Sequence, residues 1–326
     1  MKYLELMRWK NLLIIAFIGV IIRYAIILPT IKYSFPILMM DSNFSNLDFI
    51  LLLIACLSIA ASGNVINDYY DTKTDHINKP DKILIPKKIS QNKALRLHHT
   101  LNVIGIVAGL FLSYKADNLS FAFLFVLPVI LLRLYSINFS RILIVGNLII
   151  SFLAGLLIVT LGTFETLSFH QKWFPYLFTS EQVVISNSPT YTIFYWIFGL
   201  AFFSFLVTWI RELAKDIADI EGDRFVGAQT IPIKWGVKAS KGFIIAISIL
   251  TAVCVFILSS KMDNQNSFKF TFEYATLIIA LLIGIIYLTV KADNKESYKF
   301  ISTVCKGLML IGILYPAINH IILHLI

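Results

Sequence analysis

The sequence predicts an all-α membrane protein, a multi-pass bundle of about nine transmembrane helices. Three observations support this fold class. Hydrophobic residues make up 58% of the 326 residues and charged residues only 14%, the mean hydropathy is +0.78, and apolar runs long enough to cross about 30 Å of hydrocarbon recur along the whole chain. A soluble domain of ordinary composition is therefore not expected.

Each predicted helix is an apolar run bounded by polar or charged residues. The first run follows MKYLELMRWK. Because this run is long and no small-residue cleavage site follows it, we expect a retained helix and not a secretion signal. Arg23 lies inside it, where a charge is costly unless the side chain faces the bundle. In chain order the nine runs cover residues 11–32, 49–67, 96–115, 119–135, 142–164, 191–213, 242–260, 272–290 and 304–325.

Lys and Arg residues predict the orientation of the chain. With the amino terminus assigned to the cytoplasm, most of the 28 basic residues fall in the alternate connections on that side, as the positive-inside rule requires. The net charge of +9 is therefore topological and predicts no nucleic-acid binding. We expect an integral protein of a bacterial inner membrane, surrounded by the lipid bilayer, with the amino terminus on the cytoplasmic side.

Two clusters of aspartates occur in a chain that has only 19 acidic residues. Asp68, Asp71 and Asp75 follow the second run. A second trio with the same spacing follows the sixth run, at Asp216, Asp219 and Asp223. Both trios are predicted on the cytoplasmic side. Their constant offset predicts one domain over residues 1–326 with two internal parallel repeats, each carrying an Asp-rich motif.

These aspartates are unfavourable for folding alone. If the second helix continues to Asp75, the three carboxylates share one face about 6 Å apart, and neighbouring pairs repel by about 3 kcal/mol at an effective dielectric near 20. Because both clusters end helices, the helix dipole is expected to oppose negative charge there. A single aspartate at the end of a span is often only a solvated boundary residue, but two matched clusters point to function.

The carboxylates predict a magnesium site. Mg²⁺ prefers hard oxygen ligands and typically bridges one or two protein carboxylates to substrate phosphates. Two clusters that face each other would therefore hold Mg²⁺ around a diphosphate. Basic residues beside the clusters can bind phosphate oxygens directly, and these include Lys82, Arg211, Lys215 and Arg224.

Both motifs resemble those of the UbiA family of intramembrane prenyltransferases. The first motif of that family, NDxxDxxxD, is matched from Asn67 to Asp75, and the second, DxxDxxxD, is matched from Asp216 to Asp223. The runs NVINDYYDTKTDHINKP and RELAKDIADIEGDRFVGAQTIPIKWG are most similar to the digeranylgeranylglyceryl phosphate synthases and their bacterial relatives. The resemblance covers the whole chain.

Two shorter segments also resemble the family. RWKNLLI, which contains Arg8 and Asn11, is similar to the amino-terminal segment near the active-site mouth. The YxxxK element begins at Tyr135 but has Phe139 in place of its lysine, and Arg141 lies two residues beyond Phe139. This departure predicts that a phosphate contact has shifted or that the acceptor differs from the usual aromatic one.

The resemblance implies a helical bundle around a central cavity and a magnesium-dependent reaction. A polyprenyl group would move from an allylic prenyl diphosphate donor to a lipophilic acceptor, with release of diphosphate. The implied catalytic residues are Asn67, Asp68, Asp71, Asp75, Asp216, Asp219 and Asp223. The implied Mg²⁺ ligands are Asn67, Asp71, Asp75, Asp219 and Asp223, and the implied substrate-binding residues are Arg8, Asn11, Lys82, Tyr135, Arg141, Arg211, Lys215 and Arg224.

The sequence leaves the acceptor open between two classes. The branch resemblance favours an acceptor of the geranylgeranylglycerol phosphate type in lipid biosynthesis, and the alternative is an aromatic acceptor of quinone biosynthesis, 4-hydroxybenzoate or dihydroxynaphthoate. A secondary transporter is the alternative from another class, because internal repeats and acidic residues also occur there. Transport sites, however, usually lie near the bilayer midplane, whereas these aspartates are predicted at helix ends.

Overall fold

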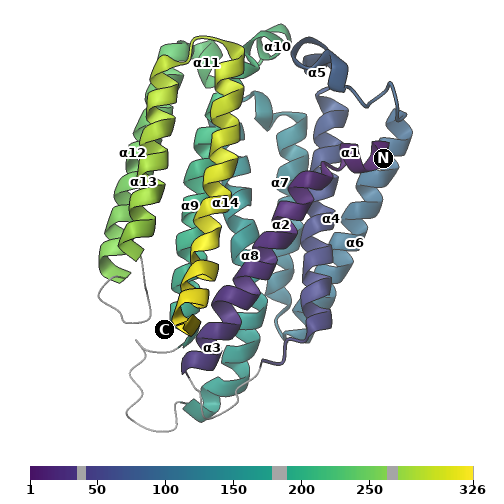
Figure 1. Ribbon diagram of the computed structural model, residues 1–326. Coiled ribbons are helices and arrows are strands. Elements are labelled where there is room, and N and C mark those ends of the chain that lie inside the picture. Colours follow the sequence, from purple (N-terminus) through teal and green to yellow (C-terminus); the bar gives the residue numbers. More distant parts are fainter. Residues whose placement is uncertain (35–41, 178–188, 263–270, 326) are drawn as a thin grey trace. The chain divides into compact units, whose positions relative to one another are not determined.

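A computed structural model of the chain describes residues 1–34, 42–177, 189–262 and 271–325 (Figure 1). Within these ranges every regular element is a helix. In chain order the elements are α1 (Lys2–Leu6), α2 (Trp9–Ile21), the π-helical turn η1 (Ile22–Ile27), α3 (Leu28–Ser34), α4 (Asn46–Tyr70), α5 (Thr72–Asn78), η2 (Pro80–Lys82), α6 (Gln91–Lys115), η3 (Leu119–Ala122), α7 (Phe123–Ile137), η4 (Phe139–Arg141), α8 (Val145–Leu177), α9 (Pro189–Ala218), α10 (Ile220–Phe225), α11 (Ile231–Lys234), α12 (Gly236–Met262), α13 (Thr271–Lys291) and α14 (Lys295–Leu325).

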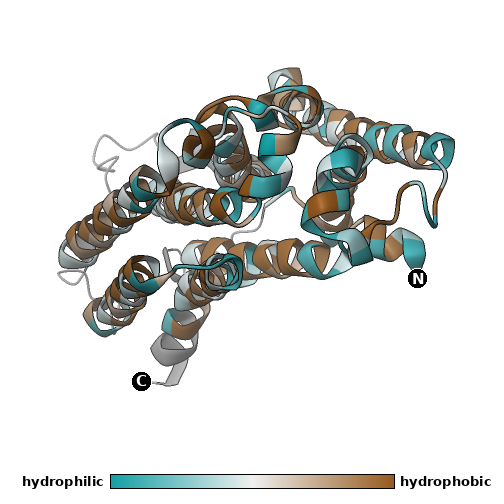
Figure 2. Cartoon of the chain, turned by 90° about the horizontal axis from the view of Figure 1, so that it is seen from above, coloured by the Kyte–Doolittle hydropathy of each residue, from teal (hydrophilic) through white to brown (hydrophobic). Residues whose placement is uncertain are grey.

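Nine helical stretches in the described parts of the chain are long and apolar enough to cross a membrane, from Trp9–Lys32 at one end of the sequence to Lys295–Asn319 at the other. A helix satisfies its own backbone hydrogen bonds, which is the condition for crossing hydrocarbon. Figure 2 shows brown apolar residues along the long helices and teal hydrophilic residues on the short helices and turns that face the viewer. The predicted all-α membrane fold is confirmed, and the chain is an integral membrane protein.

Several helices extend beyond the apolar runs that predicted them, and three of these bear on the site or on the packing around it. α4 continues to Tyr70 and not only to residue 67, α9 continues to Ala218 and not only to residue 213, and α14 begins at Lys295 and not at residue 304. Hydropathy marks where the chain leaves hydrocarbon, whereas backbone hydrogen bonds carry a helix on into the polar region. The added turns carry the first residues of both aspartate motifs.

The chain divides into two compact units by its internal contacts. The first unit contains Met1–Tyr69, Leu84–Arg133 and Leu156–Ala201, and the second contains Tyr70–Ile83, Leu134–Gly155 and Phe202–Ile326. The internal duplication that the sequence predicts is a separate matter, and it stays a prediction.

A buried ion pair lies inside the first unit. Nε of Arg23 is 3.0 Å from Oε2 of Glu165, and their side chains are only 5% and 2% exposed. The guanidinium also lies 4.7 Å from the ring centroid of Phe49, and the Ser42 hydroxyl donates to Oε1 of Glu165 at 3.2 Å. A charge within an apolar span needs a partner of this kind. The pair therefore explains how the first span tolerates Arg23.

The amino-terminal helix α1 packs against the first unit through one apolar side chain. Leu6 is fully buried in a cluster with Val65 of α4 and Ala94 of α6. Just after α1, the backbone carbonyl of Met7 accepts a hydrogen bond from Nδ2 of Asn64 at 3.0 Å. These contacts fix the position of the next residue, Arg8.

The second unit has its core where α12, α13 and α14 pack with the carboxy-terminal part of α9. Buried residues from these helices include Ile210, Ile244, Leu282 and Cys305. The short helices α5, α10 and α11 lie together at one end of this unit, at the top of Figure 1. Since α5 carries the end of the first aspartate motif and α10 the end of the second, this unit brings the two motifs together.

Candidate functional site

The two aspartate motifs share one local form. α4 ends one residue before Asp71, and α9 ends one residue before Asp219. The middle aspartate of each motif breaks the helix, with φ −85° and ψ 7° at Asp71 and φ −102° and ψ 10° at Asp219, in the region that often holds active-site residues. The backbone N–H of Asp75 donates to the Asp71 carbonyl at 2.8 Å, and that of Asp223 donates to the Asp219 carbonyl at 3.1 Å.

These breaks correct one expectation about the helix dipole. Asp75 lies in the first turn of α5, and Asp223 lies in the first turn of α10. The amino-terminal end of a helix favours negative charge. The expectation that the dipole opposes every aspartate of the motifs is therefore wrong for these two residues, because a new short helix begins within each motif.

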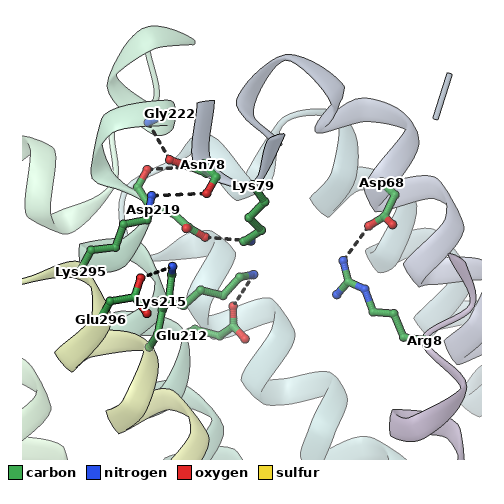
Figure 3. A network of polar contacts seen from close by, with 11 residues as sticks. Arg8, Asp68, Asn78, Lys79, Glu212, Lys215, Asp219, Gly222, Lys295 and Glu296 are labelled. Atoms are coloured by element: carbon green, nitrogen blue, oxygen red, sulfur yellow. Dashed lines mark hydrogen bonds and ion pairs between the residues drawn. The ribbon is translucent and has the colours of Figure 1, made fainter. Parts of the chain in front are cut away.

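Asn78 holds the two motifs together. Its side chain is buried at the end of α5. Nδ2 donates to the backbone carbonyl of Asp219 at 3.0 Å, and Oδ1 accepts from the backbone N–H of Gly222 at 3.1 Å (Figure 3). A Cβ at position 222 would come within 2.4 Å of Asn78 Nδ2, so only glycine fits there without displacing this side chain. The helix that carries the end of the first motif is thus bonded to the backbone of the second.

Replacing Asn78 with alanine is expected to destabilise the protein and to lower its activity. The change leaves the Asp219 carbonyl and the Gly222 N–H without this partner, at about 1–3 kcal/mol for each buried group. Thermal unfolding of the purified protein in detergent measures the loss, which we expect to be several degrees in midpoint. The exposed Asn92 of α6 provides a control, because its alanine variant should unfold with the parent. An unchanged midpoint for Asn78→Ala would show that the bridge contributes nothing.

The acids of the second unit lie close enough to repel one another. Burial, together with the nearby charges of Asp219 and Asp71, raises the pKa of Asp223 to about 7, while Lys215 and Lys79 act in the opposite direction. Nζ of Lys79 also lies 3.3 Å from Oδ2 of Asp219 (Figure 3). The site therefore gathers carboxylates from both motifs and already uses a lysine to offset part of their charge.

This donor set fits a divalent cation that also takes ligands from its substrate. In the described ranges no group of three or more His, Cys, Asp and Glu side chains is arranged to hold a metal ion by itself. Mg²⁺ seldom needs such a cage, because it keeps several waters and binds through one or two carboxylates together with substrate phosphates. Partly buried, mutually repelling carboxylates are the hard anionic ligands that such an ion requires.

Asp216 accepts a hydrogen bond from a residue that the sequence did not predict to be part of the site. Nδ2 of Asn147, a buried residue near the start of α8, donates to Oδ2 of Asp216 at 2.9 Å. Tyr135 belongs to the same neighbourhood, since its hydroxyl interacts electrostatically with Lys215, with Asp71 and with Asp216. The structure thus places the predicted Tyr135 among residues of both motifs.

One further acid, Glu212, lies beside the second motif. Its side chain is 5% exposed, and its two carboxylate oxygens contact different cations. Oε1 pairs with the guanidinium of Arg211, and Oε2 lies 3.5 Å from Nζ of Lys215. Both cations were predicted to bind substrate, but their shared counter-ion was not.

The remaining residues of the first motif lie in the first unit. Nη2 of Arg8 is 2.7 Å from Oδ1 of Asp68. Arg8 has a left-handed backbone conformation, with φ 55° and ψ 53°, at the turn between α1 and α2. Asn67 is half-buried on α4, and Asn11 is half-buried on α2. The predicted Arg8 therefore has a structural contact with the first motif, and the roles of Asn67 and Asn11 stay predictions.

Three predicted substrate-binding residues remain to be placed. The backbone carbonyl of Arg141 accepts from the N–H of Gln229 at 2.8 Å, which ties η4 to the loop after α10. Arg224 is exposed in the last turn of α10. The side chain of Lys82 lies outside what the structure describes.

Sequence reasoning missed Asn78, Asn147 and Glu212. Asn147 is a polar residue within the predicted run 142–164, and Glu212 is a carboxylate within the run 191–213. A polar or ionisable residue inside a membrane span is a signal of function, and it could have identified both. Asn78 follows a polar loop-like segment and gives no such signal.

The chain belongs to the UbiA prenyltransferase family, whose sequence pattern matches residues 27–305. A digeranylgeranylglyceryl phosphate synthase from Methanosphaera stadtmanae is 32% identical over 316 residues, which cover 95% of this chain and 96% of that protein. The family resemblance predicted from the aspartate motifs is therefore confirmed, and the chain is a prenyltransferase of this family by descent.

Solved structures with the same fold agree with the helical architecture. A structure described as digeranylgeranylglyceryl phosphate synthase in membranes has a TM-score of 0.64 at 25% identity and covers 98% of each chain. A UbiA homologue from Archaeoglobus fulgidus, solved with GPP and Mg²⁺, has a TM-score of 0.59 at 14% identity and covers 97% of this chain and all of that one. The second likeness concerns the fold alone.

Proposed function

We propose that the protein transfers a geranylgeranyl-type group from its diphosphate to the hydroxyl of a geranylgeranylglyceryl phosphate acceptor. In this reaction the allylic carbon–oxygen bond breaks and its electron pair leaves with diphosphate. The acceptor oxygen then bonds to the allylic carbon and gives up its proton. The names of the relative from Methanosphaera stadtmanae and of the similar solved structure support this acceptor class.

One observation carries the proposal. Within the second unit, Asn78 bonds the segment of the first motif to the backbone of Asp219 and Gly222, and Lys79 contacts the Asp219 carboxylate. Asp223 also feels the charges of Asp71 and Lys215, so carboxylates from both motifs and two lysines lie near one another. A diphosphate with its metal ions needs that combination of anionic ligands and cations.

We propose that Asp71, Asp75, Asp219 and Asp223 hold Mg²⁺, with Asp216 oriented by Asn147. When bound, Mg²⁺ would stabilise the negative charge that develops on the leaving diphosphate. Lys79, Lys215 and Arg211 would bind phosphate oxygens, and Tyr135 would face the allylic carbon, where an aromatic ring favours positive charge. The GPP- and Mg²⁺-bound homologue supports the ligand class, while the residue roles rest on the contacts described above.

Two findings argue against the alternative functions, a secondary transporter and an aromatic-acceptor prenyltransferase. Membership of a prenyltransferase family argues against a secondary transporter. Digeranylgeranylglyceryl phosphate synthases at about 30% identity over most of the chain support a glycerol phosphate acceptor over an aromatic acceptor of quinone biosynthesis. The missing lysine of the YxxxK element is in line with an acceptor other than the usual aromatic one.

We also infer that the amino terminus and both aspartate motifs face the cytoplasm. The excess of Lys and Arg in the connections on that side supports this orientation. The expected bacterial inner membrane stays a prediction, because the relative compared above comes from an archaeon. The prenyl tail of the donor is proposed to lie among the helices, away from water.

The function is tested by product analysis. Purified protein in lipid is incubated with prenyl diphosphates of several lengths and with geranylgeranylglyceryl phosphate, 4-hydroxybenzoate or dihydroxynaphthoate, and the products are identified by mass spectrometry. We expect a prenyl ether of the glycerol phosphate. An aromatic product alone would replace the proposed acceptor, and uptake into proteoliposomes without release of diphosphate would favour a transporter.

Replacing Asn147 with alanine is expected to raise the Mg²⁺ concentration needed for half-maximal activity by about 10–100-fold. This is the usual effect of losing a residue that orients a metal-binding carboxylate. The measurement is a Mg²⁺ titration of diphosphate release. Ser151, which lies one turn further along α8 and donates to the Asn147 carbonyl at 2.6 Å, provides a matched control on the same helix. An unchanged Mg²⁺ requirement would remove Asn147 from the site.

A further inference from the structure

Glu212 is a buried acid that belongs to neither aspartate motif. It lies on α9 with only 4% of the residue exposed, and one carboxylate oxygen contacts Arg211 while the other contacts Lys215. A buried carboxylate is costly unless positive groups compensate it. The two cations therefore stabilise Glu212, and Glu212 in turn fixes where they lie.

Lys215 lies between Glu212 and the aspartates. Its ammonium group lies 3.5 Å from a carboxylate oxygen of Glu212 (Figure 3), and it also interacts electrostatically with Tyr135 and Asp219. The same ammonium group acts on Asp216 and on Asp223. A diphosphate that entered the site would thus meet a lysine whose positive charge is already shared with a carboxylate outside the motifs.

We propose that Glu212 is a positioning residue that competes with diphosphate for Lys215 and Arg211. It holds both cations in place before the donor binds, and its ion pairs with them form again when the product pyrophosphate leaves. This inference rests on the proposed function, because it assigns Lys215 and Arg211 to the diphosphate. It concerns how fast the site can release its product and not which acceptor it uses.

The competition predicts the direction in which pyrophosphate affinity changes when Glu212 loses its charge. The affinity of the site for pyrophosphate is the difference between the contacts that the cations make with the ligand and those they make with Glu212. Removing the charge of Glu212 takes away the competitor and leaves two cations without it. Pyrophosphate should then bind more tightly, whereas the loss of a merely structural contact would loosen the site and weaken binding.

The test compares Glu212→Gln with the parent protein in lipid and in the presence of Mg²⁺. We expect pyrophosphate to bind about tenfold more tightly by equilibrium dialysis and to inhibit turnover at about tenfold lower concentration, as the loss of one charged competing contact predicts. KM for the prenyl diphosphate should fall together with kcat, because product release becomes slower. Unchanged or weaker binding of pyrophosphate would overturn the inference.

Two further variants locate the effect. Glu212→Gln combined with Lys215→Gln restores the charge balance and should return pyrophosphate affinity toward that of the parent. If the double variant bound pyrophosphate as tightly as the single variant, Lys215 would not be involved and the inference would be overturned. Glu296→Gln removes an acid whose side chain is 77% exposed, and it should bind pyrophosphate as the parent does. A tenfold gain there would also overturn the inference, since the effect would be non-specific.

A shorter acid keeps the test decisive if Glu212→Gln does not fold. Glu212→Asp draws the carboxylate back by about one carbon–carbon bond and lengthens both ion pairs, so pyrophosphate binding should tighten about two- to threefold. Weaker or equal binding by this variant contradicts the inference. Because dialysis requires no turnover, a chain that forms no prenyl ether but shows the expected order of pyrophosphate affinities would refute the proposed acceptor and leave the role of Glu212 intact.

Discussion

Asp219→Asn should abolish diphosphate release from a prenyl diphosphate, with a loss of about a thousandfold, the upper end of what one electrostatic group contributes in an active site. The amide keeps the shape of the side chain but removes the charge that a divalent cation requires. Asp219 combines two roles in the structure. Its carbonyl accepts from Asn78, and its carboxylate lies beside Lys79. The measurement is pyrophosphate release by the purified variant in lipid.

The matched control for this prediction is Asp293→Asn. Asp293 is exposed in the connection between α13 and α14 and accepts from the side chain of its neighbour Asn294, so its variant should keep the activity of the parent. Thermal unfolding should show that Asp219→Asn still folds. We expect Asp71→Asn to behave like Asp219→Asn. If both site variants released pyrophosphate at the rate of the parent, neither carboxylate would belong to the mechanism.

Removal of divalent cations should have an effect of similar size. Lys79 and Lys215 supply single positive charges, which are too few to neutralise both the cluster of aspartates and an incoming diphosphate. Excess EDTA is therefore expected to reduce turnover to the rate without enzyme, and added Mg²⁺ is expected to restore it. Pyrophosphate binding measured by dialysis should fall in parallel, which separates a loss of ligand binding from a loss of chemistry.

EDTA that has been saturated with Mg²⁺ serves as the control for the chelator itself. It should leave turnover unchanged. Full activity in excess free chelator, after dialysis against it, would argue against a metal-assisted reaction and would leave the lysines and arginines as the groups that bind the diphosphate.

Much of the fold could be predicted from the sequence, because apolar length is a direct physical requirement for crossing hydrocarbon. Nine runs predicted nine spans, and the described helices contain all nine. The ends were less accurate. α9 continues to Ala218, since backbone hydrogen bonding does not stop where the apolar side chains stop. Neither hydropathy nor spacing could show that Asp71 and Asp219 interrupt their helices.

The candidate site was predictable only in part. Spacing identified the aspartates because a repeated pattern of acids is rare in an apolar chain. Asn78 and Asn147 were not identified, since each acts through a partner that is distant in the sequence, Asp219 in one case and Asp216 in the other. Such pairs depend on the tertiary fold, and spacing or hydropathy in a single sequence does not show which distant residues come into contact.

The ion pair between Arg23 and Glu165 has a consequence for how the polypeptide is made. Arg23 is synthesised with the first hydrophobic segment, but its counter-charge arrives only with the fifth. Until then a lone guanidinium in the lipid would cost about 3 kcal/mol. The first segment is therefore expected to stay beside the insertion machinery, or at the headgroups, until Glu165 emerges, so that maturation of the amino-terminal half waits for the middle of the chain.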